Sequence, residues 1–186
     1  MRRHYLLIIF FFSVITSFAQ QKKYSFSGEM EAGLLEGEQG SAFQLGAMAG
    51  IRKNTWGISV GSGLDYYSIR SIPVYLDVRK NIFNKPNTPF VYVSGGYHFL
   101  WLAETIDPWF GRMNEKKNGL YYRAGIGYQL PAFKTTSLFF SAGYSEKQYS
   151  ENYSSTYPCL VGPCPEYKET ISNRLRRLSI TTGLRF

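Results

Sequence analysis

Alternation of apolar and polar residues, repeated in eight long segments, restricts this chain to a fold built from β-strands. Side chains on a strand point alternately to its two faces, so each segment has one apolar face and one face of small or charged residues. Between Gly119 and Leu130, for example, Ala124 and Ile126 alternate with Arg123 and Gly125. The predicted strands are residues 24–34, 41–52, 55–67, 72–80, 90–101, 119–130, 137–149 and 173–186.

The length and the two faces of these segments favour strands that cross a membrane. Strands of soluble proteins average about five or six residues, whereas tilted membrane strands need about 9–11. Aromatic residues make up 17% of the chain, and several, such as Trp56, Tyr66 and Trp101, stand near the ends of an apolar face that is aliphatic in its middle. The small and charged second face suits a narrow interior. We therefore predict an all-β fold, an eight-stranded antiparallel up-and-down transmembrane β-barrel.

The first residues have the three regions of a secretory signal peptide. Arg2 and Arg3 precede an apolar run over residues 5–15, and Ser17-Phe18-Ala19 offers small residues for cleavage before Gln20. The run is short for a transmembrane helix, and no second apolar run of about 18 residues follows. The sequence thus predicts a signal peptide over residues 1–19 and a barrel domain over residues 20–186.

The predicted connections differ in length between the two ends of the barrel. At one end the links over residues 52–54 and 131–136 are short, and residues 81–89 are intermediate. At the other end residues 102–118 and 150–172 form long polar loops. This is the pattern of outer-membrane barrels, so we expect both mature termini in the periplasm and the long loops outside the cell.

Four features together carry a resemblance to a known family. They are the Ser17-Phe18-Ala19-Gln20 junction, the Ile72-Pro73-Val74-Tyr75-Leu76-Asp77-Val78-Arg79 strand, Gly125-Ile126-Gly127-Tyr128 and the terminal Phe186. With them, nearly the whole mature chain resembles the small outer-membrane β-barrel superfamily, the outer membrane protein beta-barrel domain with its OmpA-like, OmpX-like and PagL-like members. The resemblance implies contact with outer-membrane lipids and insertion by the barrel-assembly machinery. It implies that this machinery reads Phe186, Leu184, Ile180 and Leu178 in the last strand.

The inward face of the predicted barrel carries nearly balanced charges. They are the acids Glu29, Glu31, Asp65 and Asp77 and the bases Arg52, Arg79, Arg123, Arg177 and Arg185. Buried charges persist only when they are paired, so we predict a network of ion pairs in the lumen. Such a network is either a plug that stabilises the barrel or a narrow polar path for ions or protons. A general porin is disfavoured because it needs many more strands.

The two longest loops suggest contacts outside the cell. Cys159 and Cys164 lie close together in a secreted chain, so we predict a disulfide between them. No histidine stands near to complete a zinc site. The stiffened loop suits either recognition or resistance to proteases. Trp109 and Phe110 in the other loop either anchor an extracellular ligand or protein or fold back onto the barrel rim.

The chain offers little for catalysis. His98 is the only histidine after the signal peptide, and Ser94 on the same face is about 13 Å away along a strand. We predict no enzyme activity, no cofactor and no metal site, and the scattered basic residues of this +8 chain predict no nucleic-acid partner. The expected role is structural or one of surface interaction through the loops. The alternatives are a soluble lipocalin-like carrier of an apolar ligand and an outer-membrane lipid-modifying hydrolase.

Overall fold

The computed structural model describes residues 24–101, 104–107, 112–156 and 166–186, which contain ten β-strands. Their bounds are β1 Ser25–Gly37, β2 Gly40–Lys53, β3 Trp56–Asp65, β4 Ser71–Asn81, β5 Thr88–Leu100, β6 Glu104–Asp107, β7 Arg112–Lys117, β8 Gly119–Pro131, β9 Ser137–Thr156 and β10 Glu166–Arg185. The expected signal peptide, both cysteines, Trp109 and Phe110 lie outside the described residues, and these expectations stay predictions. Within the described part, no helix has the length and apolar character needed to cross a membrane.

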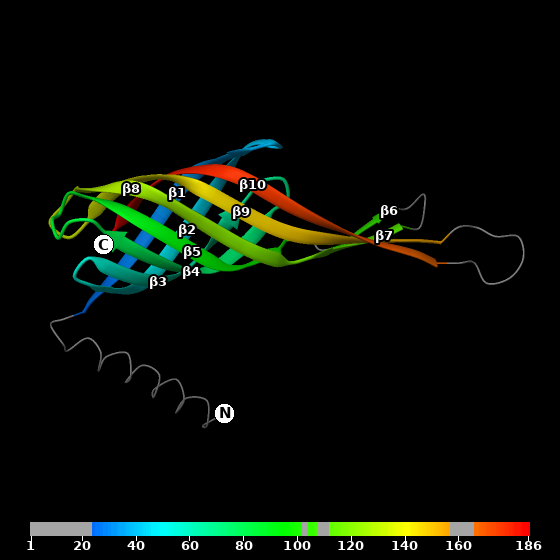
Figure 1. Ribbon diagram of the computed structural model, residues 1–186, viewed down its shortest axis with the longest axis horizontal. Coiled ribbons are helices and arrows are strands. Elements are labelled where there is room, and N and C mark those ends of the chain that lie inside the picture. The colour runs from blue at the N-terminus through cyan, green and yellow to red at the C-terminus, as the bar shows by residue number, and fades with distance from the viewer. Residues whose placement is uncertain (1–23, 102–103, 108–111, 157–165) are drawn as a thin grey trace, which may run out of the picture.

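Eight of the strands form a closed antiparallel ring (Figure 1). The order is β1-β2-β3-β4-β5-β8-β9-β10, and β10 pairs back with β1 over the registers Glu29↔Arg185 to Gly37↔Arg177. Closure leaves no open edge within the barrel wall, so every strand there has two hydrogen-bonded neighbours. The predicted eight-stranded up-and-down barrel is confirmed.

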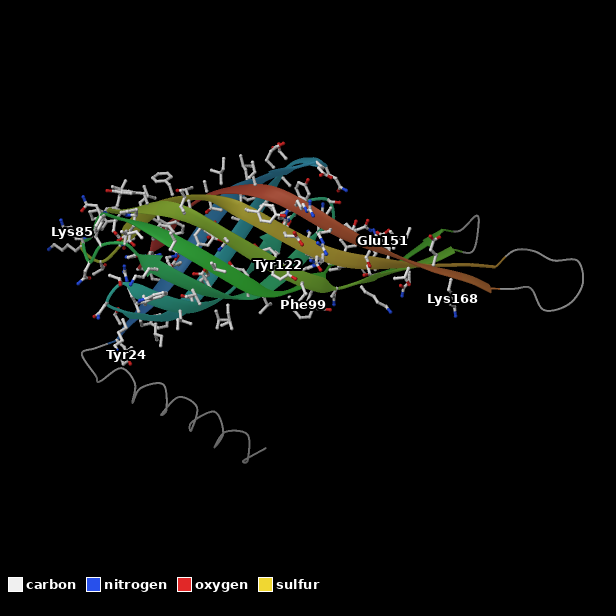
Figure 2. All side chains as sticks on the ribbon, viewed as in Figure 1. Tyr24, Lys85, Phe99, Tyr122, Glu151 and Lys168 are labelled. Carbon is white, nitrogen blue, oxygen red and sulfur yellow. The ribbon has the colours of Figure 1, made fainter. Side chains whose placement is uncertain are left out.

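The apolar face of each barrel strand points outward and the polar face points into the lumen, as the alternation requires (Figure 2). Val60 and Leu76 are each 57% exposed, and Ile126 and Ile180 are each 67% exposed. The buried set is instead rich in charged and hydroxyl side chains, among them Arg123 at 2% exposure. This barrel is therefore apolar outside and polar inside, the reverse of a soluble barrel.

The two ends of the barrel differ. One end, called the turn end here, has the β2–β3, β4–β5 and β8–β9 connections, and the described chain begins and stops there (Figure 1). The opposite end, called the loop end, has the β1–β2, β3–β4, β5–β8 and β9–β10 connections. The turn-end connections are short, as predicted, whereas the loop end combines the short β1–β2 and β3–β4 links with the two longest segments.

At the loop end much of the two long polar loops predicted from the sequence is β-strand. β9 and β10 continue well past the barrel as a paired ribbon, from Arg177↔Ser145 out to Glu166↔Thr156. β6 and β7 form a hairpin within the predicted 102–118 loop, and β7 pairs with β9 from Lys117↔Ser150 to Met113↔Ser154. β6, β7 and the outer parts of β9 and β10 continue the same sheet beyond the barrel, and this part is called the projecting sheet here (Figure 1). Its sequence is mostly polar, with apolar residues as widely spaced as Ile171 and Leu175, so it carries only a weak period-two signal in hydrophobicity.

Candidate functional site

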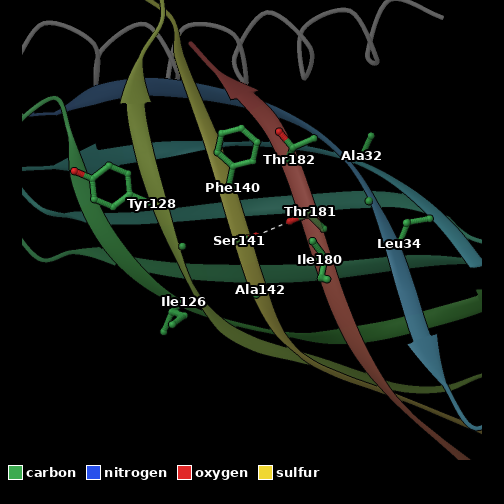
Figure 3. A pocket seen from close by; sticks show the side chains of 12 residues that line it. Ala32, Leu34, Ile126, Tyr128, Phe140, Ser141, Ala142, Ile180, Thr181 and Thr182 are labelled. Carbon is green, nitrogen blue, oxygen red and sulfur yellow. Dashed lines mark hydrogen bonds between the residues drawn. The ribbon is translucent and has the colours of Figure 1, made fainter. Parts of the chain in front are cut away.

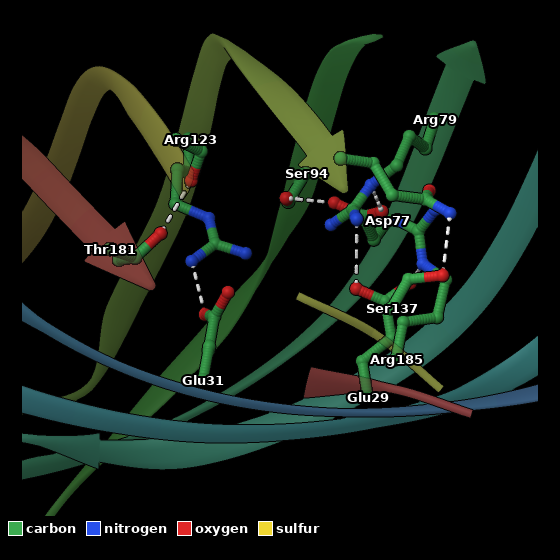
Figure 4. Close-up of polar contacts among 11 residues, drawn as sticks. Glu29, Glu31, Asp77, Arg79, Ser94, Arg123, Ser137, Thr181 and Arg185 are labelled. Carbon is green, nitrogen blue, oxygen red and sulfur yellow. Dashed lines mark hydrogen bonds and ion pairs between the residues drawn. The ribbon is translucent and has the colours of Figure 1, made fainter. Parts of the chain in front are cut away.

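The lumen and the projecting sheet are the two candidate sites. In the lumen near the turn end, one carboxylate binds two arginines (Figure 4). Glu29 lies 2.8 Å from Arg79 Nη1 and 2.8 Å from Arg185 Nε. Arg79 also lies 3.9 Å from Asp77, which accepts a 2.7 Å hydrogen bond from Ser94. Strands β1, β4, β5 and β10 each contribute to this cluster, so it ties opposite sides of the ring together.

Aromatic rings fill the space around these charges. The Arg79 guanidinium lies 4.4 Å from the centre of the Phe90 ring and 5.1 Å from that of Phe139. In the middle of the lumen Arg123 pairs with Glu31, and its guanidinium lies 5.1 Å from the Tyr92 ring centre. Cation–π contacts of this kind are favourable where both groups are desolvated. The middle of the lumen is consequently filled by side chains.

Towards the loop end, Asp65 binds two cations. Arg177 Nη1 lies 2.5 Å from Asp65 Oδ2, and Lys147 Nζ lies 3.3 Å from Oδ1. Lys147 is fully buried and also donates hydrogen bonds to the carbonyl oxygens of Tyr67 and Ile69, at 3.0 and 2.9 Å. These bonds hold the β3–β4 connection over the mouth of the barrel.

An apolar cluster closes the lumen above this charge group. It consists of Leu35, Tyr67, Tyr149 and Leu175, which are at most 7% exposed. The Tyr67 hydroxyl accepts a 2.8 Å hydrogen bond from the backbone N–H of Gln39, which joins the cluster to the β1–β2 hairpin. The loop end of the lumen is thereby capped by packed side chains.

Of the nine charged residues assigned to the lumen from the sequence, the structure buries eight and joins them in ion pairs. Arg52 differs, because it is half-buried at the turn-end mouth. There it borders a small cavity of about 10 Å³ together with Glu29, Arg79 and Arg185. The distribution places three arginines around one glutamate at this mouth.

Lys147 is a lumen residue that the prediction from sequence did not include. It lies two residues after Ser145 on β9 and so points to the same, inward side. The outward side chains around it are polar, so the sequence pattern is weak there. Continuing the alternation past Tyr144 would have found it. Its partners, the Tyr67 and Ile69 carbonyls, come from a turn and follow no side-chain pattern.

His98 and Ser94, the residues on which the hydrolase alternative depends, take separate partners. His98 Nε2 lies 2.5 Å from the carbonyl oxygen of Gln148, while Ser94 bonds to Asp77. His98 and Ser94 are 0% and 1% exposed. The described residues also hold no group of acidic, histidine or cysteine side chains arranged for a metal ion.

The four residues of the predicted assembly signal lie on the outer wall of β10 and at its end. Leu178, Ile180, Leu184 and Phe186 are between 45% and 67% exposed. The backbone of Phe186 exchanges hydrogen bonds of 2.8 and 2.9 Å with Gly28 of β1, at the seam where the ring closes. Beside this seam the outer wall has a shallow apolar hollow of about 670 Å³, where the small Ala32 and Ala142 lie among larger side chains (Figure 3).

The projecting sheet is joined to the barrel by a β-bulge. β8 pairs with β9 up to Tyr121↔Lys147 and β7 resumes at Lys117↔Ser150, so one strand has an extra residue at Asn118–Gly119. Asn118 Oδ1 accepts a 2.9 Å hydrogen bond from Leu100 N at the end of β5. The bulge thereby fixes how the sheet leaves the barrel.

Polar contacts stiffen the described part of the projecting sheet. Thr170 donates a 2.9 Å hydrogen bond to Asn152, and Lys116 lies 3.3 Å from Glu151. Beyond Arg177, the described residues include no strand on the β1 side of β10. As far as the described residues go, one edge of the ribbon is unpaired for about 35 Å, at about 3.3 Å per residue.

Comparisons with known proteins agree with this geometry. No family model and no curated protein matches the sequence. Among solved structures, Neisserial surface protein A is 15% identical with a TM-score of 0.54, over 87% of this chain and 97% of that one. The outer membrane protein OprG from Pseudomonas aeruginosa is 10% identical with a TM-score of 0.56, over 87% and 95%.

A major outer membrane protein from Thermus thermophilus is 14% identical with a TM-score of 0.52, over 88% of this chain and 99% of that one. At such identities the agreement is one of fold, and it extends over nearly the whole length of each solved chain. The chain has the fold of the small eight-stranded outer-membrane β-barrels.

Proposed function

We propose that this chain is an integral outer-membrane β-barrel whose role is surface interaction through its projecting sheet, without transport through its lumen. The observation that carries the proposal is a lumen filled and capped by side chains beneath a polar sheet that stands clear of the barrel. In this proposal the turn end faces the periplasm and the projecting sheet lies outside the cell. The barrel is expected to be inserted by the barrel-assembly machinery.

The outer wall supports a membrane location. Val60, Leu76, Ile126 and Ile180 form part of a continuous apolar surface around the barrel. Water in contact with so large an apolar patch would be unfavourable, whereas lipid chains cover it at no such cost. A soluble carrier would need the opposite arrangement, with apolar residues around an inner cavity, so the carrier alternative loses support.

The lumen supports a closed barrel. The Asp65–Arg177 pair lies directly beneath the apolar cap that contains Tyr67 and Leu175. A hydrated path would have to break this packing and separate buried charges from their partners, which costs several kcal/mol. The burial of His98 and Ser94 likewise leaves no open approach for a substrate, and it supports a role without catalysis.

The projecting sheet supports recognition. A paired ribbon loses less conformational entropy on binding than a flexible loop does, and its open β10 edge exposes backbone donors and acceptors to a partner. The predicted Cys159–Cys164 disulfide would stiffen the tip further. One barrel of the same fold is described as a surface protein.

Cysteine labelling on intact cells tests the orientation. In a Cys159→Ser, Cys164→Ser background, we place a single cysteine by Lys168→Cys in the projecting sheet or by Lys85→Cys in the β4–β5 turn. A membrane-impermeant maleimide should label the first protein on intact cells and the second only after the outer membrane is permeabilised. The reverse pattern would overturn the proposed orientation, and labelling of both on intact cells would argue against a membrane-spanning barrel.

Site-specific photo-crosslinking tests the surface role. A photoreactive residue in place of Ile171, which is 41% exposed on the projecting sheet, should give a defined adduct on the cell surface. The same residue in place of Val60 on the barrel wall is the matched control and should react with lipid alone. Equal protein adducts at both sites, or none at Ile171, would contradict docking through the projecting sheet.

A further inference from the structure

Exposed charge is divided unevenly between the two ends of the barrel. The turn end has four lysines, Lys53, Lys80, Lys85 and Lys134. Among the described residues, every acidic side chain that is not buried lies at the loop end or in the projecting sheet; these are Glu36, Glu38, Glu146, Glu151 and Glu169. The turn end therefore has positive charge with no exposed acidic side chain, in the part the structure describes, to balance it.

The four lysines are spread around the rim. Lys53 ends β2 at the β2–β3 turn, Lys80 lies near the end of β4, Lys85 lies in the β4–β5 turn, and Lys134 lies in the β8–β9 turn. The strand order places these three turns at separate points of the ring. A small soluble anion would need the cations to converge on one point, whereas a layer of anionic headgroups meets each of them where it stands.

Aromatic rings contact two of these lysines and lie beside a third. Lys80 Nζ lies 4.5 Å from the centre of the Trp56 ring, and Lys53 Nζ lies 5.1 Å from that of Tyr24. Phe133, beside Lys134, is 77% exposed. Aromatic rings favour the boundary between lipid chains and water, and lysine stems lie along apolar surface with the ammonium in the polar layer.

The lumen mouth adds to the positive charge of this rim. Arg79 and Arg185 both bind Glu29, and Arg52 stands beside them, so three guanidinium groups share one carboxylate at the mouth. Asp77 offsets one further charge from deeper inside, at 3.9 Å from Arg79. The mouth keeps a positive excess that points towards the same membrane surface as the lysines.

We propose that the turn-end lysines form a rim that binds the phosphate headgroups of anionic phospholipids in the leaflet on that side. This inference rests on the proposed membrane location of the barrel. Its consequence is a local enrichment of anionic lipid around the turn end, which fixes the depth of the barrel and favours one orientation. The loop end, where acids and bases are mixed, has no such preference.

Tryptophan quenching by brominated lipid tests the rim, because a tryptophan stands at each end of the wall. A Trp101→Phe, Trp109→Phe protein keeps Trp56, which is 53% exposed next to Lys80. The full chain is reconstituted in mixed vesicles of phosphatidylglycerol and phosphatidylcholine, with one lipid or the other brominated. We expect Trp56 to favour phosphatidylglycerol about fivefold, the ratio that corresponds to about 1 kcal/mol for one lysine near the surface.

Two comparisons show whether the lipid preference at Trp56 comes from the turn-end lysines or from the net charge of the whole protein. Replacing all four turn-end lysines by Gln should bring the lipid ratio at Trp56 to about one. A control that removes four loop-end cations, by Arg70→Gln, Lys117→Gln, Arg174→Gln and Arg176→Gln, should leave it near fivefold. A second reporter with Trp56→Phe and Trp109→Phe keeps Trp101, 59% exposed at the loop end, and should show a ratio near one.

The remaining outcomes distinguish failure of the rim from failure of the membrane location. Equal quenching of Trp56 by both lipids, or a preference that survives loss of the four lysines, overturns the rim but leaves the membrane barrel intact. Absence of quenching by either brominated lipid overturns the membrane location itself. Heat-modifiable gel mobility of each variant shows that the barrel has folded before its lipid ratio is measured.

Discussion

Two carboxylates in this lumen each bind two cations, so their removal should lower the stability of the barrel more than the removal of other charged residues. Asp65 joins β3 to both β9 and β10 through Lys147 and Arg177, while Glu29 joins β1 to β4 and β10. Removing Asp65 leaves the buried Lys147 and Arg177 without their carboxylate, whereas Arg79 keeps Asp77 at 3.9 Å when Glu29 is removed. An exposed pair at the surface has no comparable effect, because water replaces the lost partner.

Asp65→Ala should lower the free energy of unfolding by about 3–5 kcal/mol, because it leaves the buried cations Arg177 and Lys147 without the carboxylate that neutralises them. Urea titration in detergent micelles, followed by the heat-modifiable gel shift, measures the change. The matched control is Glu146→Ala, whose partner Arg174 is 58% exposed. That control should change the unfolding free energy by about 0–1 kcal/mol. Equal effects of the two variants would show that the Asp65 cluster is not structural.

Gly61→Ala should destabilise the barrel by about 1–3 kcal/mol, because the added Cβ would stand 2.6 Å from the Tyr75 ring and 2.7 Å from Met48. Gly95→Ala is the control, since nothing lies within 4 Å of its added Cβ. Combining Gly61→Ala with Tyr75→Leu should recover part of the loss in a double-mutant cycle. Additive costs would mean that the ring does not limit the space.

At the scale of elements, the projecting sheet is joined to the barrel and is not part of its closure. β8 pairs with β5 and with β9 inside the ring, and β7 begins its pairing with β9 only past the bulge at Asn118–Gly119. The ring hydrogen bonds do not depend on β6 or β7. The barrel and the sheet should therefore respond separately to changes in the hairpin.

Replacing residues 102–117 by a short Gly-Ser linker should leave the barrel folded, because the linker removes only the β6–β7 pairing and the β7 contact with β9. The heat-modifiable shift should persist with an unchanged midpoint. Limited proteolysis should then cut the exposed β9–β10 ribbon faster than in the unaltered chain. Loss of the gel shift would show that the hairpin supports closure.

For the whole molecule, the arrangement of polarity decides what the barrel does. The outer wall is apolar, the lumen is filled by ion pairs and rings, and an apolar cap with Tyr67 closes its loop end. We propose that such a molecule is anchored in lipid and presents its projecting sheet on one side of the membrane. In the proposed function its interior stabilises the ring and leaves no route through it.

Purified protein in planar bilayers should show no sustained conductance of the kind that water-filled porins give, because the Asp65 cluster and its cap obstruct the lumen. Single-channel recording at neutral pH and high salt measures this. Asp65→Ala, which loosens the same region, should give brief openings more often than Glu146→Ala. Steady conductance of the unaltered chain would contradict a closed barrel.

The sequence determined the strands and their two faces. Alternation along residues 72–80 or 119–130 is a local property, because each side chain takes its face from its position along the backbone. The even strand number and the short turns then indicated a closed up-and-down ring. The inward placement of Glu29, Arg79 and Arg123 followed from the odd or even position of each residue along its strand.

Only the tertiary structure decided which charges meet and what lies beyond the barrel. The pairing of Asp65 with Arg177 depends on the stagger of β3 against β10, which lie at a distance in sequence and are set by closure of the ring. The partners of Lys147, which are the Tyr67 and Ile69 carbonyls, and the bulge at Asn118 depend on how distant segments meet. In the β9–β10 extension only a few apolar residues, such as Tyr149, Ile171 and Leu175, interrupt polar ones, so backbone hydrogen bonds between distant segments define it more than the hydrophobic pattern does.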